Sequence, residues 1–289
     1  MKGEIDSINH VGLVVHDLDA TCNFYEDLGF ILSPLSMHKG ALKPGEPEQP
    51  YGTGNRCAVF PKNYFEIFAH VNKDMFDFNI KRFLGRFEGA HIIAFNCGDA
   101  SVVAKRLDET GIENSGVIPL ERDVDTPEGL RAAKFDCIHF SASLTPEGLI
   151  QAAHHRTPQY IHQPQLLEHP NKAVALSETI LCTDDPEATE HRYRSFLGFE
   201  SVREGAKRVF RFPLVSRLSI VSPDEIADVV PGCVPPVLPY MAETTFATTD
   251  IDAVRRRLDK KGITDQSFGG KITVPAEVAF GHAIAFEPA

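Results

Sequence analysis

INHVGLVVHDLDATCNFYEDLGF, residues 8–30, joins a strand pattern to a helix pattern. Its opening residues, 8–15, are rich in β-branched side chains, which favours a β-strand. Asp17 stands where a helix N-cap would stand, Phe24 and Leu28 share one helical face, and a glycine follows where a helix commonly ends. A turn-rich stretch and two more apolar segments, CAVFP and YFEIFAHV, complete a β-α-β-β-β unit of about 70 residues.

The same order of strand, acidic turn, helix and glycine recurs along the chain. AVALSETILCTDDPEATEHRYRSFLGF, which starts at Ala173, repeats DLDAT as DPEAT and YEDLGF as RSFLGF. Weaker copies start at His91 (HIIAFNCGDASVVAKRLDETGI) and at Ala242 (AETTFATTDIDAVRRRLDKKGI). Internal repetition of this kind indicates a repeat architecture. We predict an N-terminal domain (1–160) and a C-terminal domain (161–289), each built of two modules: 5–72 and 88–160, then 172–223 and 238–288.

Composition limits the classes of function. The 289 residues carry a net charge of −11 with scattered basic residues, which argues against a nucleic-acid partner. The sequence contains no run of 18 apolar residues, and its N-terminus has no apolar segment. We therefore predict a cytoplasmic chain with no membrane partner. The six Cys are far apart and form no CxxC, so we expect free thiols. The expected partner is a small-molecule substrate, and a homodimer stays open.

The repeated unit resembles the modules of the vicinal oxygen chelate (VOC) superfamily. Residues 8–30 are similar to the opening of glyoxalase and methylmalonyl-CoA epimerase-type proteins. GTGNRCAVFPKNYFEIFAH (52–70) and HHRTPQYIHQPQLLEHPN (154–171) resemble the glyoxalase-like-domain branch of that superfamily. The resemblance implies an α+β fold of four βαβββ modules, paired into two curved mixed sheets flanked by helices.

The resemblance also implies a metal site, because VOC ligands lie on the first and last strands of each paired module. Carried over position by position, these are His10 and Glu66 in the first module and His91 at the start of the second. Imidazole nitrogens and a carboxylate form a set that suits one divalent ion, Fe²⁺, Mn²⁺, Ni²⁺ or Zn²⁺.

The fourth ligand has three candidates, Gln151, His154 and His155, in the segment GLIQAAHHR. A strand alternates its faces, so only one of the two histidines can point inward. Resemblance to the branch's own pattern favours His154 as the metal ligand. No carboxylate lies between Glu147 and Glu168, so the glyoxalase base is missing there. A histidine titrates near neutrality, and we therefore predict His154, His155 and Glu66 as the catalytic candidates.

The second pair of modules is expected to be degenerate. Its first-strand positions hold Glu178 and Glu243 in place of histidine. The last-strand position of the third module falls near Leu218–Ser219, without a ligand side chain, and the fourth module offers only His282 and Glu287 without a clear register. Whether the two glutamates bind a second metal stays open.

Three functions follow as expectations. The leading one is a metal-dependent lyase or isomerase of glyoxalase-like type, in which the ion stabilises an enolate or oxyanion of a small oxygenated substrate. An Fe(II) extradiol ring-cleaving dioxygenase needs two histidines and one glutamate, which the predicted site also supplies. A non-catalytic small-molecule-binding protein of the resistance type would hold an apolar ligand within the curved sheet.

Overall fold

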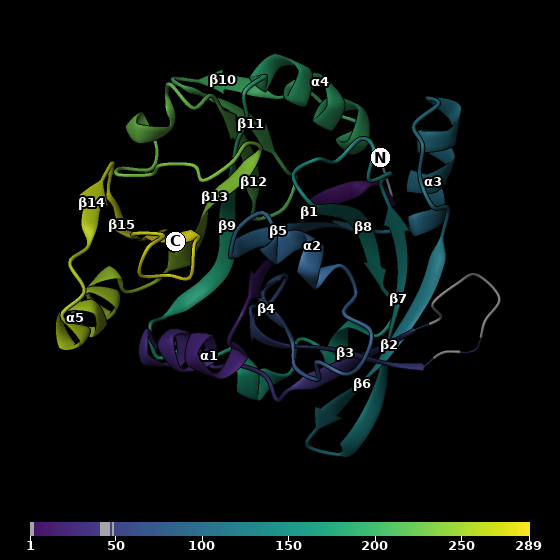
Figure 1. Cartoon of the computed structure of the whole chain (residues 1–289), viewed down its shortest axis with the longest axis horizontal. Coiled ribbons are helices and arrows are strands. Elements are labelled where there is room, and N and C mark those ends of the chain that lie inside the picture. The colour runs from purple at the N-terminus through teal and green to yellow at the C-terminus, as the bar shows by residue number, and fades with distance from the viewer. Residues whose placement is uncertain (1–2, 41–46, 48) are drawn as a thin grey trace.

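The computed structural model of this chain describes residues 3–40, 47 and 49–289 (Figure 1). The first module contains β1 (Ile5–Val15), α1 (Leu18–Asp27), β2 (Ser36–Gly40), β3 (Gln49–Val59) and β4 (Tyr64–His70). After α2 (Ile80–Leu84), the second contains β5 (Gly89–Cys97), α3 (Ala100–Glu109), β6 (Ile118–Thr126), β7 (Gly129–His139) and β8 (Leu149–His155). The stretch expected to be turn-rich includes β2 and the start of β3, although 41–46 and 48 lie outside the described residues.

The third and fourth modules repeat this order with shorter strands. After the short helices η1 (Pro158–Tyr160) and η2 (Pro164–Leu166), the third module contains β9 (Ala173–Cys182), α4 (Pro186–Leu197), β10 (Val202–Glu204), β11 (Lys207–Arg211) and β12 (Arg217–Val221). After η3 (Ile226–Asp228), the fourth contains β13 (Tyr240–Thr248), α5 (Ile251–Lys261), β14 (Gln266–Phe268), β15 (Lys271–Val274) and β16 (Ala283–Pro288).

The strand pairing follows one rule in both halves. In the first half β1 runs parallel to β4 and antiparallel to β5, and β5 runs parallel to β8. In the second half β9 runs parallel to β12 and antiparallel to β13, and β13 runs parallel to β16. One residue pair, Met241 with Ala90, joins the halves into a continuous sheet. The predicted fold of repeated βαβββ modules in curved mixed sheets is confirmed, and α1, α3, α4 and α5 lie at its periphery (Figure 1).

The repeated acidic turn is a helix N-cap. Asp17, Asp99, Asp185 and Asp250 each accept a hydrogen bond from a backbone N–H in the first turn of the following helix. Such a cap satisfies a donor that the helix itself leaves unpaired. The four caps therefore mark equivalent positions in the four modules, and residues can be compared by their distance from them.

The main core lies between the two halves. Phe65 on β4, Phe246 on β13 and Phe286 on β16 are fully buried there, and Phe246 packs against both other rings. Since successive strand residues point to opposite faces, the other face of β1 and β4 carries His10 and Glu66. We call this face of the β1–β8 sheet, with the side chains it encloses, the N-terminal cup. No helix in the described part of the chain is long and apolar enough to cross a membrane.

Candidate functional site

His10 and Glu66 meet in the N-terminal cup, where the pairing of β1 with β4 brings them together. The His10 Nε2 atom lies 3.8 Å from the Glu66 Oε2 atom, and both residues are buried. Gly12 pairs with Glu66 across the two strands, and a Cβ atom on this glycine would stand 2.9 Å from Glu66 Oε2. The absence of a side chain at Gly12 thus leaves the carboxylate its space.

The His10 imidazole is neutral and fixed in one tautomer. Burial, together with the charge of Arg122, lowers its pKa to about 3. Its Nδ1 atom lies 2.8 Å from Asn9 Oδ1, which can only accept, so Nδ1 carries the proton. The ring also stacks on Tyr64, with centroids 4.5 Å apart. The lone pair of Nε2 is therefore free on the side that faces Glu66.

The Glu66 carboxylate is held by a short polar chain. Its Oε1 atom accepts a hydrogen bond from Asn55 Nδ2, and Asn55 Oδ1 accepts one of 3.1 Å from Arg122 Nη1. Burial raises the pKa of Glu66, while the Arg122 charge and the Asn55 hydrogen bond oppose this shift. A carboxyl group with a raised pKa is suited to exchange protons near neutral pH.

Two further cup residues were missed by the sequence analysis. Arg122 arrives from β6, and His38 arrives from β2, where its Nδ1 lies 2.9 Å from Thr53 Oγ1 and its ring stacks on Phe68. Burial lowers the pKa of His38 to about 3. Neither residue belongs to a motif, and no sequence signal places β2 and β6 beside the His10–Glu66 pair.

The inward histidine of β8 is His155, whereas the resemblance favoured His154. The His155 Nε2 atom lies 3.2 Å from Asn9 Oδ1, the oxygen that also accepts from His10, and its Nδ1 atom has no partner. His154 lies on the opposite face and contacts the backbone oxygen of Cys97 through Nδ1 at 3.2 Å. Strand alternation allows only one of two neighbours to face the cup, and the structure places His154 outside it.

His91 also points away from the cup. Its Nε2 atom donates to the backbone oxygen of Phe87 at 2.9 Å, and its ring stacks on Phe87 and Phe83. The N-caps explain this placement: His10 lies seven residues before Asp17, but the residue seven before Asp99 is Ile92. Ile92 does face the cup, where it packs with Val14 and Phe68. The assignment of His91 was one residue out of register, which moves a side chain to the other face of a strand.

The four ligand positions of the cup are therefore only partly filled by donors. Gln151 pairs with Ala94 as Glu66 pairs with Gly12, so it occupies the fourth position. Ile92 offers no donor atom at the third position. Among the described residues, no three His, Cys, Asp or Glu side chains gather to hold a metal ion. His10 and Glu66 supply two donors of the kind that divalent ions accept, and the Gln151 side chain contacts His139, but the predicted set with His91 and His154 does not assemble.

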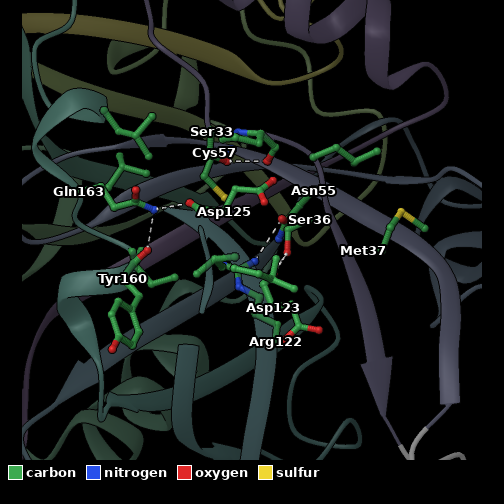
Figure 2. Close-up of a pocket in the computed structure, with 17 residues that line it drawn as sticks. Ser33, Ser36, Met37, Asn55, Cys57, Arg122, Asp123, Asp125, Tyr160 and Gln163 are labelled. Atoms are coloured by element: carbon green, nitrogen blue, oxygen red, sulfur yellow. Dashed lines mark hydrogen bonds between the residues drawn. The ribbon is translucent and has the colours of Figure 1, made fainter. Parts of the chain in front are cut away.

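A cavity of about 240 Å³ opens beside this polar cluster (Figure 2). Asn55, Cys57 and Arg122 line its polar side, and Figure 2 shows Arg122 and Asn55 joined by a hydrogen bond. The rest of its lining combines apolar side chains with the polar residues Ser36, Asp123, Asp125 and Gln163, and the apolar ones include Met37, Val59, Val124, Leu130, Ile161 and Leu166. An apolar cavity with a few convergent polar groups is the usual form of a small-molecule site.

A family model described as "Glyoxalase-like domain" matches residues 8–197. This chain is a member of the glyoxalase-like domain family. No protein of curated function matches it by sequence. The match includes the whole N-terminal cup and ends with α4 in the third module.

Solved structures resemble the fold of this glyoxalase-like protein over nearly its whole length. A hypothetical protein from Staphylococcus aureus has a TM-score of 0.66 at 14% identity, with 99% of this chain and 100% of that chain covered. A mutant 4-hydroxymandelate synthase from Streptomyces coelicolor gives 0.61 at 11% identity, covering 98% and 92%. The Mn(II)-bound glyoxalase from Novosphingobium aromaticivorans gives 0.55 at 13% identity, covering 98% and 82%. These likenesses confirm the VOC fold.

The second half of this glyoxalase-like protein has a different cluster at the equivalent positions. Glu178, seven residues before Asp185, is fully buried on β9. Its oxygens lie 2.7 Å from Lys207 Nζ, 2.8 Å from Arg217 Nη2 and 2.5 Å from Ser219 Oγ. Burial opposes ionisation of Glu178, but the charges of Lys271, Lys207 and Arg217 outweigh it and lower its pKa. We call the inner face of the β9–β16 sheet the C-terminal cup.

Lys271 on β15 provides a cation inside the C-terminal cup. Its Nζ atom lies 2.8 Å from Glu178 Oε2, 3.4 Å from Glu243 Oε1 and 3.0 Å from Thr245 Oγ1. Glu243 lies seven residues before Asp250, so an ammonium group joins the two glutamates at the first-strand positions. Because Lys271, Lys207 and Arg217 together balance these carboxylates and would repel a further cation, the arrangement does not suit a second metal.

The remaining candidates of the second half serve structural contacts. His282 is buried between the backbone oxygen of Met241 and the hydroxyl of Thr244. Glu287 pairs with Arg217 at 2.8 Å. The last-strand positions hold Ser219 and Ala285, by pairing with Ile180 and Thr245. Both lack a metal-binding group, as the sequence indicated for the third module.

Proposed function

We propose that the N-terminal cup is the active site of a VOC-type enzyme that moves a proton next to a carbonyl group of a small oxygenated compound, in lyase or isomerase chemistry. The observation that carries this proposal is the buried His10–Glu66 pair at 3.8 Å. A cavity of about 240 Å³ lies beside the Asn55 and Arg122 side chains that hold Glu66.

Glu66 is the proposed proton acceptor. Its raised pKa brings the carboxylate closer to the basicity that proton transfer from carbon requires at neutral pH. Asn55 fixes the Oε1 atom, and Oε2 faces His10. His10 stays neutral, and Asn9 holds its ring so that Nε2 faces the same space. His155 adds a second neutral imidazole on the far side of Asn9.

We further propose that this reaction depends on a divalent ion, Fe²⁺, Mn²⁺, Ni²⁺ or Zn²⁺, held by His10 and Glu66 with Gln151 at the fourth position. Such an ion polarises a bound carbonyl as a Lewis acid. The tautomer of His10 supports this role, because a metal-binding imidazole typically donates its other N–H to an oxygen such as that of Asn9.

Metal analysis tests the proposal. Protein purified without a His-tag is assayed for bound metal and for thermal shifts with each of the four ions, beside His10→Ala, Glu66→Gln and the outward-facing control His154→Gln. We expect a metal-dependent shift in the wild type and the control, and none in the two cup variants. A wild type that holds no metal and is stabilised by none of the four ions would falsify the metal-dependent form of the proposal.

Ile92 favours one second candidate, a non-catalytic protein that binds its ligand without metal. The side chain fills a ligand position with hydrocarbon and packs against Phe68. Ligand binding that is unaffected by chelator and accompanied by no turnover would favour this candidate. The same residue weakens the extradiol dioxygenase, which needs a second histidine at that position, and oxygen uptake with catechols under ferrous iron tests it.

A further inference from the structure

We infer that the N-terminal cup binds an organic anion, with a carboxylate of the ligand on the Arg122 guanidinium. The inference rests on the proposed function for the location of the site, and it adds the class of ligand. Its basis is the environment of Arg122, a cation inside the cup that the proton-transfer chemistry does not use.

Arg122 forms no direct ion pair with any residue that the structure describes, although the Glu66 charge acts on it at longer range. Its guanidinium donates to the neutral amide oxygen of Asn55 at 3.1 Å and lies over the Phe135 ring at 5.7 Å. Its Nε atom is buried and forms no hydrogen bond. A cation removed from water without a counter-charge is costly, and a guanidinium donor left unpaired adds to that cost. A carboxylate ligand would remove both penalties.

Among the surrounding titratable groups, Glu66 is the one that can be negative, and it does not contact Arg122 directly. Burial raises the pKa of Cys57 to about 12 and that of Tyr64 well above its usual range, so both are neutral. His10 and His38 are neutral because their pKa values fall to about 3. Glu66 is separated from Arg122 by Asn55, and its own pKa is raised by burial. The Arg122 guanidinium therefore lacks a direct carboxylate contact at the polar end of the cup.

Two acidic residues of β6 also line the cavity at its exposed edge. Asp123 and Asp125 alternate with Arg122 and Val124 along β6 and are exposed, and Asp123 pairs with Lys39 at 3.7 Å. Figure 2 shows Arg122 and Asn55 beside each other at the cavity.

The cavity defines the rest of the ligand. Its other walls are largely apolar, so the body of the ligand is a small hydrocarbon or aromatic group. Asn55 bridges Arg122 and Glu66, so a carboxylate on Arg122 brings the adjacent carbon towards the Glu66 carboxylate. The ligand class is thus a small carboxylic acid with an apolar body and an oxygen function on the neighbouring carbon.

Paired acids and esters test this inference through binding alone. Acetate, benzoate, mandelate and benzoylformate are titrated by calorimetry and thermal shift, each beside its methyl ester, against wild type, Arg122→Met and Arg122→Lys. Lys39→Met is the matched control, because it removes an equal charge outside the cavity. We expect at least one acid to bind more tightly than its ester, and we expect Kd to rise by about 10- to 100-fold in Arg122→Met, as for loss of a charged hydrogen bond.

The outcomes separate this inference from the proposed function. Wild-type binding of an acid that Arg122→Met loses, and that Arg122→Lys restores in part and Lys39→Met keeps, supports the inference. It is overturned if no acid in the series binds, if the esters bind equally well, or if Arg122→Met retains full affinity. His10→Ala should keep acid binding while it loses metal and turnover, so failure of the proposed chemistry would leave the Arg122 result unchanged.

Discussion

The two cups of this protein share a fold and differ in whether the cation inside them is paired with carboxylates. In the C-terminal cup, Lys271 joins Glu178 and Glu243 at the two first-strand positions. In the N-terminal cup the same positions hold His10 and Ile92, and the nearby Arg122 forms no direct ion pair with a described carboxylate. The C-terminal cup is thus balanced by its own side chains, whereas the N-terminal cup retains donors that only a ligand or an ion can satisfy. This difference supports the proposal that the N-terminal cup is the functional one.

Removal of the Lys271 ammonium group from the C-terminal cup should cause the largest change in the free energy of unfolding. Lys271→Met leaves Glu178 and Glu243 without the ammonium group between them, and loss of one partner from a buried ion cluster costs about 3 kcal/mol. Urea denaturation should show that loss of stability, while the exposed Lys260→Met on α5 should change little. An unchanged free energy of unfolding in Lys271→Met would show that Lys207 and Arg217 alone are enough to compensate the buried glutamates.

A second histidine should sharpen the comparison by completing the metal set of the N-terminal cup. Ile92→His places an imidazole at the position that His91 misses. With Mn²⁺ at 100 times its Kd, binding should stabilise the variant by about 2.7 kcal/mol relative to its metal-free form. The measurement is the difference in thermal stability with and without Mn²⁺, which cancels the packing lost with isoleucine. Ile92→Leu is the control, and an equal metal response in both variants would contradict the placement of residue 92.

Glutamine substitution should change stability with opposite sign in the two cups. The pKa of Glu178 is lowered in the folded state, so its contribution is present above its usual value of 4.5 and is lost as pH falls below it. The pKa of Glu66 is raised, so its ionised form weakens the fold as pH rises above 4.5. At pH 7, Glu178→Gln should destabilise the protein and Glu66→Gln should stabilise it by about 1 kcal/mol. Denaturation curves from pH 4 to 8 provide the test, and equal signs would show that the cups do not differ in this way.

The smallest effect should come from His154, which faces away from the N-terminal cup. His154→Gln removes only a contact with the Cys97 backbone oxygen, so we expect a change within about 0.5 kcal/mol and no loss of ligand binding. His155→Gln should weaken binding of the carboxylic acid in the N-terminal cup, because His155 shares the Asn9 oxygen with His10. Binding isotherms of the two variants compare the faces of β8 directly, and a larger defect in His154→Gln would reverse the assignment.

Sequence patterns predicted the modules and the first strand–helix unit because caps and strand alternation are local properties. Asp17 and Asp185 cap their helices through contacts with nearby residues, and the positions of His10 and Glu178 can be counted back from them. The same rule, counted back from Asp99, reaches Ile92 and would have excluded His91. Arg122 could not be found in this way, because its contact with Asn55 joins residues that are distant in sequence.

Lys271 has a consequence for how the protein responds to its surroundings. An ammonium group carried on the chain is never depleted, diluted or exchanged, and no chelator removes it. If the N-terminal cup holds the proposed ion, metal starvation should leave the C-terminal cup intact, and the whole effect of the missing ion should fall on the N-terminal cup. The protein would then persist as a folded apoprotein that recovers as soon as metal returns, without refolding.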